Sequence, residues 1–202
     1  MTTKNWNWEL YDVCERGSLD RVELVIKKGL SEGYIFDWNE GFYGACKGCY
    51  ITLVGLMLHK GATDFNHGLY DVCRNGRDDI FCIIVNKGDC LSYDFDWNYP
   101  LRGACTGGHL DLAKIILDRG IDEGYRFDWG LLFRCACEGG NIDIVDSIID
   151  KGSEEGFVFD WNSGLRGACL CDNTNVIDLM ISKGASECCC KVSIDNHGYS
   201  RM

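Results

Sequence analysis

The chain lacks the features that mark a membrane protein or a nucleic-acid binder. Among its 202 residues there is one proline, no stretch approaching 18 consecutive apolar residues and no basic run. A membrane-spanning helix needs about 20 mostly apolar residues, and binding to a phosphate backbone needs a positive footprint on the protein. Since the formal net charge is −11, we expect neither a membrane span nor a nucleic-acid partner.

Residue patterns typical of catalysis or cofactor binding are also missing. The four histidines lie in no nucleophile motif such as G-x-S-x-G, and no G-K-[ST] phosphate loop occurs. The pairs Cys135/Cys137 and Cys169/Cys171 do not predict zinc, because residues two apart on a helix point in different directions. We therefore expect no enzymatic activity, no cofactor and no metal, and we interpret His109 as a structural residue of a turn.

Cysteine is abundant, with 14 residues. A disulfide scaffold is not favoured, because six of the cysteines recur at one spacing in a position typical of a buried small residue. Residues 1–5 carry no apolar signal segment, so we expect reduced thiols and a cytoplasmic or nuclear location, with a virion location as a further option. We interpret Cys188, Cys189 and Cys190 as filler, rather than as a metal or lipidation site.

What the sequence does contain is a repeat. A cysteine and a glycine each recur six times, with steps of 32, 27, 32, 32 and 32 residues. The cysteines are Cys14, Cys46, Cys73, Cys105, Cys137 and Cys169, and the glycines are Gly29, Gly61, Gly88, Gly120, Gly152 and Gly184. Because several residue types share this spacing, it predicts a stack of repeated units. The short step arises where five connector residues are missing between Gly61 and Leu69, and there we expect a notch.

Each unit reads as two short helices and a connector. In the most regular unit, Asn98 is the predicted N-cap of the first helix, and Gly120 is the predicted left-handed C-cap of the second helix. Between them, Leu101, Ala104 and Cys105 recur at i, i+3 and i+4, which is one apolar face of a helix. The connectors alternate aromatic residues with others, which predicts a strand with one aromatic pointing in and one pointing out.

These residues resemble the ankyrin repeat. The stretch Gly108-His109-Leu110-Asp111 is similar to the start of the family's second helix, and Pro100-Leu101 followed by Ala104-Cys105 is similar to its Thr-Pro-Leu-His-x-Ala-Ala, although the other units lack the proline. The recurring Asp-Trp-Asn and the mixture of 32- and 27-residue steps look most like the ankyrin proteins of giant DNA viruses of the mimivirus type. The resemblance covers about residues 6–185. It implies an all-α, ankyrin-type solenoid of six stacked helix-turn-helix repeats with hairpin-like connectors, used for protein binding without catalysis.

The expected boundaries of the repeats follow this period. The units span 6–37, 38–64 (with the short connector), 65–96, 97–128, 129–160 and 161–185. In the first unit, Trp8 is expected to cover the open N-terminal end of the stack. Residues 186–202 are interpreted as a vestigial seventh unit, because Asn196-His197-Gly198-Tyr199 echoes Asn66-His67-Gly68-Leu69.

Three sets of positions are the candidate protein-binding residues. The first set follows the leading Leu or Phe of each unit and comprises Tyr11, Tyr43, Tyr70, Arg102, Arg134 and Arg166. The second set lies just after the repeat cysteine, on the concave face in the ankyrin family, and comprises Arg16, Lys47, Arg74, Thr106 and Glu138. The third set opens the connectors and comprises Tyr34, Tyr93, Tyr125 and Phe157. Each set also has an alternative interpretation without a partner. The first set would contact the backbone of the adjacent connector, and the second would vary by neutral sequence drift. The third would pack one connector, or finger, against the next.

The function expected from these observations is a non-enzymatic scaffold that binds a protein partner on its concave face and fingers, as a monomer. The acidity mildly favours a basic partner, although plain solubility is the alternative explanation of the charge. The alternative function is that of a structural or virion-associated repeat protein with no specific partner.

Overall fold

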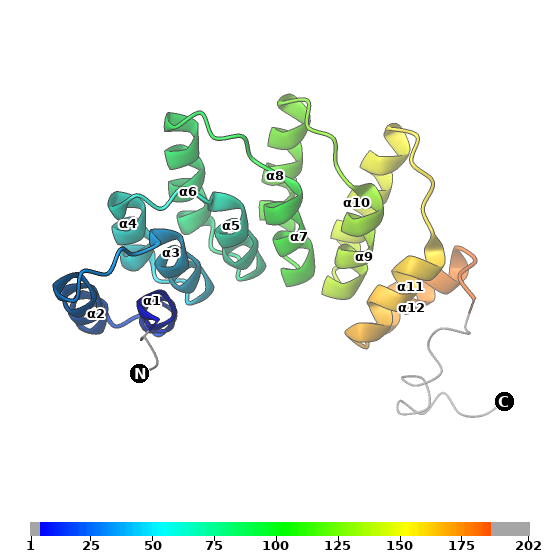
Figure 1. Cartoon of the computed structure of the whole chain (residues 1–202). Helices are drawn as coiled ribbons and strands as arrows, with labels where there is room; N and C mark the ends of the chain where they lie inside the picture. Colours follow the sequence, from blue (N-terminus) through cyan, green and yellow to red (C-terminus); the bar gives the residue numbers. More distant parts are fainter. Residues whose placement is uncertain (1–4, 187–202) are drawn as a thin grey trace. The chain divides into compact units, whose positions relative to one another are not determined.

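The computed structural model describes residues 5–186, and this part of the chain contains α-helices and no strand (Figure 1). The helices come in pairs, and each pair is followed by a connector. Their bounds are Trp6–Glu15 (α1), Leu19–Ser31 (α2), Trp38–Lys47 (α3), Ile51–Lys60 (α4), Phe65–Arg74 (α5), Asp78–Cys90 (α6), Asn98–Gly107 (α7), Leu110–Asp122 (α8), Trp129–Gly139 (α9), Ile142–Glu154 (α10), Trp161–Leu170 (α11) and Thr174–Ser182 (α12). The prediction of an all-α fold is confirmed. Apart from Ser186, the predicted seventh unit lies outside the described residues, and so do Cys188, Cys189 and Cys190.

Two compact units divide the chain between Pro100 and Leu101. In the first unit, α3 packs against α1, α4 and α5, and α6 packs against α4 and α5. In the second unit, α9 packs against α10 and α11, α8 contacts α10, and α12 packs against α11. Within each unit the odd-numbered helices therefore form one layer and the even-numbered helices the other. We call the exposed side of the odd-numbered helices the odd-helix face.

The repeat cysteines lie in the core of each unit, where neighbouring helices meet. Five of them have 0% exposure, namely Cys14, Cys46, Cys73, Cys105 and Cys137. The sixth, Cys169, is half-buried. Burial raises the pKa of Cys14 and of Cys137 to about 12. Such thiols stay protonated at neutral pH, so they pack as small apolar side chains and do not act as nucleophiles.

The aspartate of the recurring Asp-Trp-Asn caps the first helix of a pair. The carboxylates of Asp37, Asp128 and Asp160 accept hydrogen bonds from N–H groups in the first turns of α3, α9 and α11, each at 3.0 Å. In the same way Asp96 accepts from the N–H of Asn98 at 3.0 Å. The prediction of Asn98 as the N-cap is therefore wrong, because an aspartate two residues earlier takes that role.

The recurring glycine of the longer repeats lies inside its helix. Gly120 belongs to α8, which continues to Asp122, and the left-handed residue is Gly124, at a φ of +71°. The predicted C-cap at Gly120 is therefore wrong. A Cβ on Gly120 would lie 2.4 Å from Cζ of Phe127, so this glycine leaves room for a buried ring. The same arrangement holds for Gly29, Gly88 and Gly152.

After α4 and α12 the recurring glycine has a different role. Gly61 and Gly184 follow α4 and α12 with φ angles of +110° and +101°, a left-handed conformation that favours glycine. The next residues, Ala62 and Ala185, are buried at 1% and 7% exposure.

The long connectors are extended but are not strands. In the link from α2 to α3, the N–H of Tyr34 donates back to the carbonyl of Gly29 at 2.9 Å, so it is used within its own repeat. Phe36 is buried, and the ring of Tyr34 packs edge-on against it, with 5.3 Å between the centroids. Ile35, between them, is 90% exposed. The predicted strand with one aromatic in and one out is wrong, because residues two apart in an extended chain share a side.

Candidate functional site

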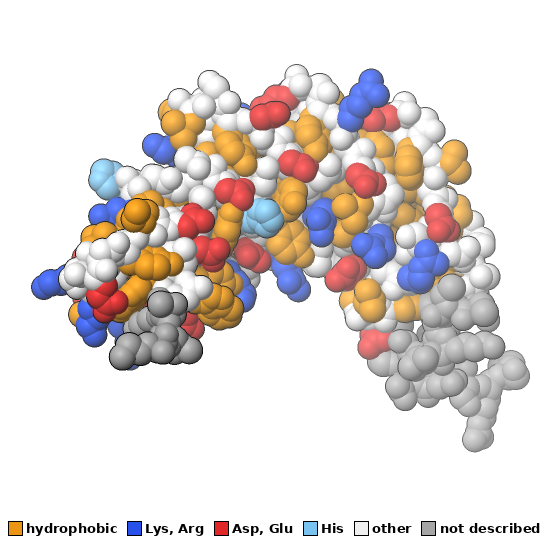
Figure 2. All heavy atoms as spheres, viewed as in Figure 1, with side chains coloured by type: hydrophobic (Ala, Val, Ile, Leu, Met, Phe, Trp, Pro, Cys, Tyr) orange, Lys and Arg blue, Asp and Glu red, His pale blue; other side chains and the backbone are white. Residues whose placement is uncertain are grey.

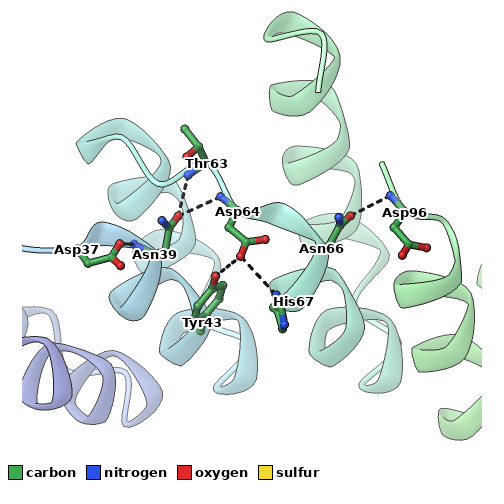
Figure 3. Close-up of polar contacts among 8 residues, drawn as sticks. All are labelled: Asp37, Asn39, Tyr43, Thr63, Asp64, Asn66, His67 and Asp96. Carbon is green, nitrogen blue, oxygen red and sulfur yellow. Dashed lines mark hydrogen bonds and ion pairs between the residues drawn. The ribbon is translucent and has the colours of Figure 1, made fainter. Parts of the chain in front are cut away.

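Side-chain hydrogen bonds to the backbone hold neighbouring repeats together, and the first set uses the asparagine of Asp-Trp-Asn (Figure 3). Asn39 Oδ1 accepts from the N–H groups of Thr63 and Asp64 at 2.8 and 3.0 Å. Asn66 Oδ1 accepts from the N–H of Asp96 at 3.1 Å. Asn7 and Asn162 make equivalent bonds. The aspartate therefore caps its own helix, while the asparagine clamps the following connector.

In a second set of hydrogen bonds, the side chain of the residue just before the second helix of a pair donates to a backbone carbonyl of the preceding repeat. Asn141 Nδ2 donates to the carbonyl of Gly108 at 3.1 Å. In the first unit, Arg77 Nη1 donates to the carbonyl of Cys49 at 2.6 Å. The recurring residues therefore connect and cap the repeats, whereas the exposed side chains of the odd-numbered helices vary between repeats.

In the first unit, rings line the odd-helix face. They come from two positions of the odd-numbered helices. One is the position of the first candidate set, which is Tyr in the first unit and Arg in the second and which we call the Tyr/Arg set. The other position is three residues earlier, about one helical turn away on the same side. These rings, none of which is buried, belong to Trp8, Tyr11, Tyr43, His67, Tyr70 and Tyr99. Trp8 is 72% exposed, so the expectation that it covers the end of the stack is wrong.

Three of these rings and one aspartate form a group that we call the Tyr43 cluster: Tyr43, His67, Tyr99 and Asp64. The Tyr43 hydroxyl donates to Oδ2 of Asp64, and the same oxygen lies 3.4 Å from Nδ1 of His67 (Figure 3). The His67 ring is 5.6 Å from the Tyr43 ring and 5.2 Å from the Tyr99 ring, measured between centroids. Burial first, and then the bond to Asp64, raises the pKa of Tyr43, so it remains a neutral donor. The cluster is open to solvent, since the side chains of His67 and Asp64 are 61% and 40% exposed.

Two basic residues of the first unit already have partners on this face. Lys47 Nζ lies 3.0 Å from Oε1 of Glu15 and 5.6 Å from the centroid of the Tyr11 ring. Arg16 Nη2 lies 2.8 Å from Oδ1 of Asp12. Arg74 is exposed on this face as well.

In the second unit, arginine replaces tyrosine on the odd-helix face. Arg134 and Arg166 are exposed and Arg102 is half-buried. Arg166 Nη2 lies 3.5 Å from Oδ2 of Asp160, the aspartate that caps its own helix. The hydroxyl of Thr106 donates within its helix to the Arg102 carbonyl, at 2.8 Å. Figure 2 shows acidic side chains over α3 and α5 of the first unit and a succession of basic side chains over the second unit. The change from Tyr to Arg thus coincides with the division into two units.

The remaining candidate residues are less accessible. Tyr34, Tyr93 and Tyr125 are half-buried, and each ring packs edge-on against the phenylalanine two residues later. Phe157 is 38% exposed. Glu138 is half-buried in α9.

Asp64, His67 and Tyr99 were not among the residues singled out from the sequence. His67 and Tyr99 share one position, three residues before the Tyr/Arg set, and the helical period could have revealed it. Asp64 could not have been found in this way, because its approach to Tyr43 depends on the path of the short link.

In residues 5–186, no group of three or more His, Cys, Asp or Glu side chains is placed to hold a metal ion. No helix in this range has the length and apolar character needed to cross a membrane. Ten cysteines of the range are free thiols.

Comparison with known proteins identifies a solved structure with a similar fold. No family model matches the sequence, and no curated protein matches it. Among solved structures, the crystal structure of the human ASB11 ankyrin repeat domain is similar to this chain. The sequences are 19% identical, the TM-score is 0.54, and the alignment covers 88% of this chain and 84% of that chain. The prediction of an ankyrin-type α-solenoid is confirmed, and at this identity the likeness concerns the fold alone.

Proposed function

We propose that this ankyrin-type chain is a non-enzymatic scaffold that binds a protein partner through its odd-helix face and connectors. One observation carries the proposal. The residues that recur cap helices, bond to the neighbouring repeat or lie in the core, whereas the exposed positions of the odd-numbered helices vary between repeats. A constant frame with variable exposed residues is the arrangement by which repeat proteins recognise partners.

The composition of the face supports the same function. Tyrosine and arginine are enriched at protein interfaces, because they bring a large contact area together with hydrogen-bonding groups. Tyr11, Tyr43 and Tyr70 hold one position of this face in the first unit, and arginines hold it in the second. We propose that the protein acts as a monomer in the cytoplasm or the nucleus.

Affinity capture followed by mass spectrometry tests this function. The bait is the full chain, compared with a variant in which Tyr43, Tyr70, Arg102 and Arg134 are replaced by alanine. We expect specific partners with the wild type and their loss with the variant. A matched variant with alanine at the exposed outer positions Asp20, Glu23, Asp111 and Lys114 should keep them. An unchanged partner list with the first variant would remove this surface from consideration.

A structural role is the second candidate, and it follows from the resemblance of Asp-Trp-Asn and of the mixed repeat lengths to giant-virus ankyrin proteins. In that case the protein is part of a virus particle and has no specific partner. Quantitative proteomics of purified particles separates the two functions. High copy number in particles, with no partner captured from infected cells, would favour the structural role.

A further inference from the structure

We propose that the odd-helix face of the first unit binds a basic segment of the partner, and that the Tyr43 cluster receives a lysine or arginine side chain of that segment. The inference rests on the scaffold function proposed above and specifies the chemistry of the partner. Three separate observations lead to it: a carboxylate diverted from its usual role, a row of exposed rings, and two of the protein's own cations that are held by carboxylates, one of them also by a ring.

The diverted carboxylate is that of Asp64. It occupies the N-cap position of α5, yet its side chain makes no capping hydrogen bond. The equivalent aspartates Asp37, Asp128 and Asp160 all cap their helices. Asp64 instead turns to Tyr43 and His67, and both contacts use Oδ2. One carboxylate oxygen and 40% of the side-chain surface are therefore left to a donor from outside.

The surrounding charge favours a cation as this donor. Asp64, Asp37 and Glu40 all lie close enough to Tyr43 for their negative charges to raise its pKa. These three negative charges around Tyr43 attract a positively charged side chain and repel an acidic one.

The rings supply the second half of the site. Tyr43, His67 and Tyr99 follow one another with 5.6 and 5.2 Å between centroids. An ammonium or guanidinium group within about 6 Å of a tyrosine ring is attracted by the negative face of the ring. A cation that approaches Asp64 therefore meets Tyr43 or Tyr99 at the same time.

The protein already holds two of its own cations on this kind of face, one between a carboxylate and a ring and one by a carboxylate alone. Lys47 sits between the carboxylate of Glu15 and the ring of Tyr11, at 3.0 and 5.6 Å. In the second unit, Arg166 takes the position equivalent to Tyr43 and reaches the N-cap carboxylate of Asp160 at 3.5 Å. At the Tyr43 cluster the Asp64 carboxylate keeps one oxygen outside its contacts with Tyr43 and His67, and a cation of the partner can reach it beside the Tyr43 ring.

Peptide binding to the full chain tests the inference. The probe is a fluorescein-labelled peptide of alternating Lys, Arg and Gly, and two control peptides replace the basic residues by Gln or by Glu. We expect the basic peptide to raise the fluorescence polarisation of the probe saturably, and the two controls to bind at least about tenfold more weakly. Equal binding of the Glu peptide would overturn the inference.

Variants locate the site. Glu40→Gln with Asp64→Asn is expected to weaken binding of the basic peptide about tenfold, since it removes two charges and keeps the shapes. Asp20→Asn with Glu23→Gln removes two charges from the exposed side of α2 and should change the affinity by less than about twofold. Equal losses in the two variants would mean non-specific attraction and would overturn the proposal. Circular dichroism confirms that each variant is folded.

The rings are tested separately, with Tyr99→Leu, which keeps an apolar side chain but removes the ring. We expect the basic peptide to bind this variant about threefold to fivefold more weakly. An unchanged affinity would show that the Tyr99 ring does not contribute to binding. If the basic peptide fails to bind while the capture experiment still loses partners with the alanine variant, only the basic-segment inference is wrong. If neither experiment shows a dependence on this face, the scaffold function at this surface is wrong as well.

Discussion

The link between α2 and α3 and the link between α4 and α5 join the same kinds of helices within the first unit, but different contacts close them. In the long link, Phe36 covers Gly29, where a Cβ would lie 2.5 Å from the ring. The indole N–H of Trp6 donates to Glu32 at 2.9 Å, which ties the start of this link to the first helix of the same repeat. The long link is therefore anchored by its own aromatic and acidic side chains.

The short link has neither the ring nor the glutamate. Gly61 turns the chain at a φ of +110°, Ala62 is buried directly after it, and Lys60 Nζ lies 5.7 Å from the Trp38 ring. The shorter path brings Asp64 to Tyr43. The comparison teaches that shortening a connector can leave the helix pairs in place and yet move a carboxylate from a cap to the exposed face.

The largest effect should come from filling the space above the buried glycine of the long link. Gly29→Ala places a methyl group 2.5 Å from Cζ of Phe36. The ring must move, and we expect the free energy of unfolding to fall by about 2 kcal/mol, even though alanine favours the helix by about 1 kcal/mol. Urea denaturation measures this loss.

A double-mutant cycle identifies the cause. If the clash with the ring is responsible, Gly29→Ala should cost less than about 0.5 kcal/mol in a Phe36→Leu background. The matched control is Gly55→Ala in α4, where a Cβ would meet nothing within 4 Å. That change should stabilise the protein by about 0.5–1 kcal/mol. A stabilising Gly29→Ala would mean that the ring does not need the glycine.

In the short link, a substitution of the glycine should destabilise the protein through backbone conformation and not through a steric clash. At Gly61 a Cβ would meet nothing within 4 Å, but φ is +110°. Gly61→Ala is therefore expected to lower the free energy of unfolding by about 1.5 kcal/mol through backbone strain alone. Gly61→Asn should cost less, because asparagine tolerates the left-handed region better. Equal costs for Ala and Asn in urea denaturation would contradict a conformational cause.

The bond that only the short link provides should have a smaller effect. Tyr43→Phe removes the hydrogen bond to Asp64, and we expect a loss of about 1 kcal/mol at neutral pH. The pKa of Tyr43 is raised above its usual 10.0 in the folded protein. The folded state therefore keeps this proton at pH values where the unfolded chain has lost it, so Tyr43 makes the protein less stable as the pH rises above 10.

Denaturation as a function of pH measures this contribution. Between pH 8 and the alkaline limit of folding, the stability of the wild type should fall more steeply than that of Tyr43→Phe. At neutral pH the variant is the less stable of the two, so the curves should converge as the pH rises. Parallel curves would show that the hydroxyl of Tyr43 is not held as described.

Much of the fold could be predicted from the sequence, because the determining signal is a spacing. The cysteine position and the apolar residues beside it report burial directly, and five of the six cysteines are fully buried. The helix ends could not be predicted in the same way. Whether Gly120 ends its helix depends on Phe127, whose ring needs the space beside the glycine. That contact follows from packing and not from local preference.

The candidate site was predictable only in part. Tyr43 stands out because it belongs to a set that varies between repeats. Asp64 has the composition of an ordinary cap, and its side chain contacts Tyr43 across a separation of 21 residues. The functional meaning of Asp64 therefore depends on the length of the short link, which a pattern of single positions does not reveal.

The smallest effect should come from completing the asparagine clamp where a long link lacks it. In the second unit, Gly130 is the repeat equivalent of Asn39. Because glycine has no side chain, this position provides no acceptor for the N–H of Asp160 in the link from α10 to α11. Gly130→Asn supplies one. Its Cβ would lie 3.3 Å from Cζ of Phe157, which is 38% exposed and therefore free to shift by a few tenths of an ångström.

We expect Gly130→Asn to raise the free energy of unfolding by about 0.5–1 kcal/mol, through one new hydrogen bond and the loss of glycine flexibility. Gly130→Ala separates the two contributions, because alanine removes the flexibility and adds no acceptor. If the clamp stabilises the link, the N–H of Asp160 in the asparagine variant should also exchange with deuterium more slowly than in the alanine variant. Identical exchange rates would show that asparagine at this position does not reach the following connector, and that the long link needs only its buried phenylalanine.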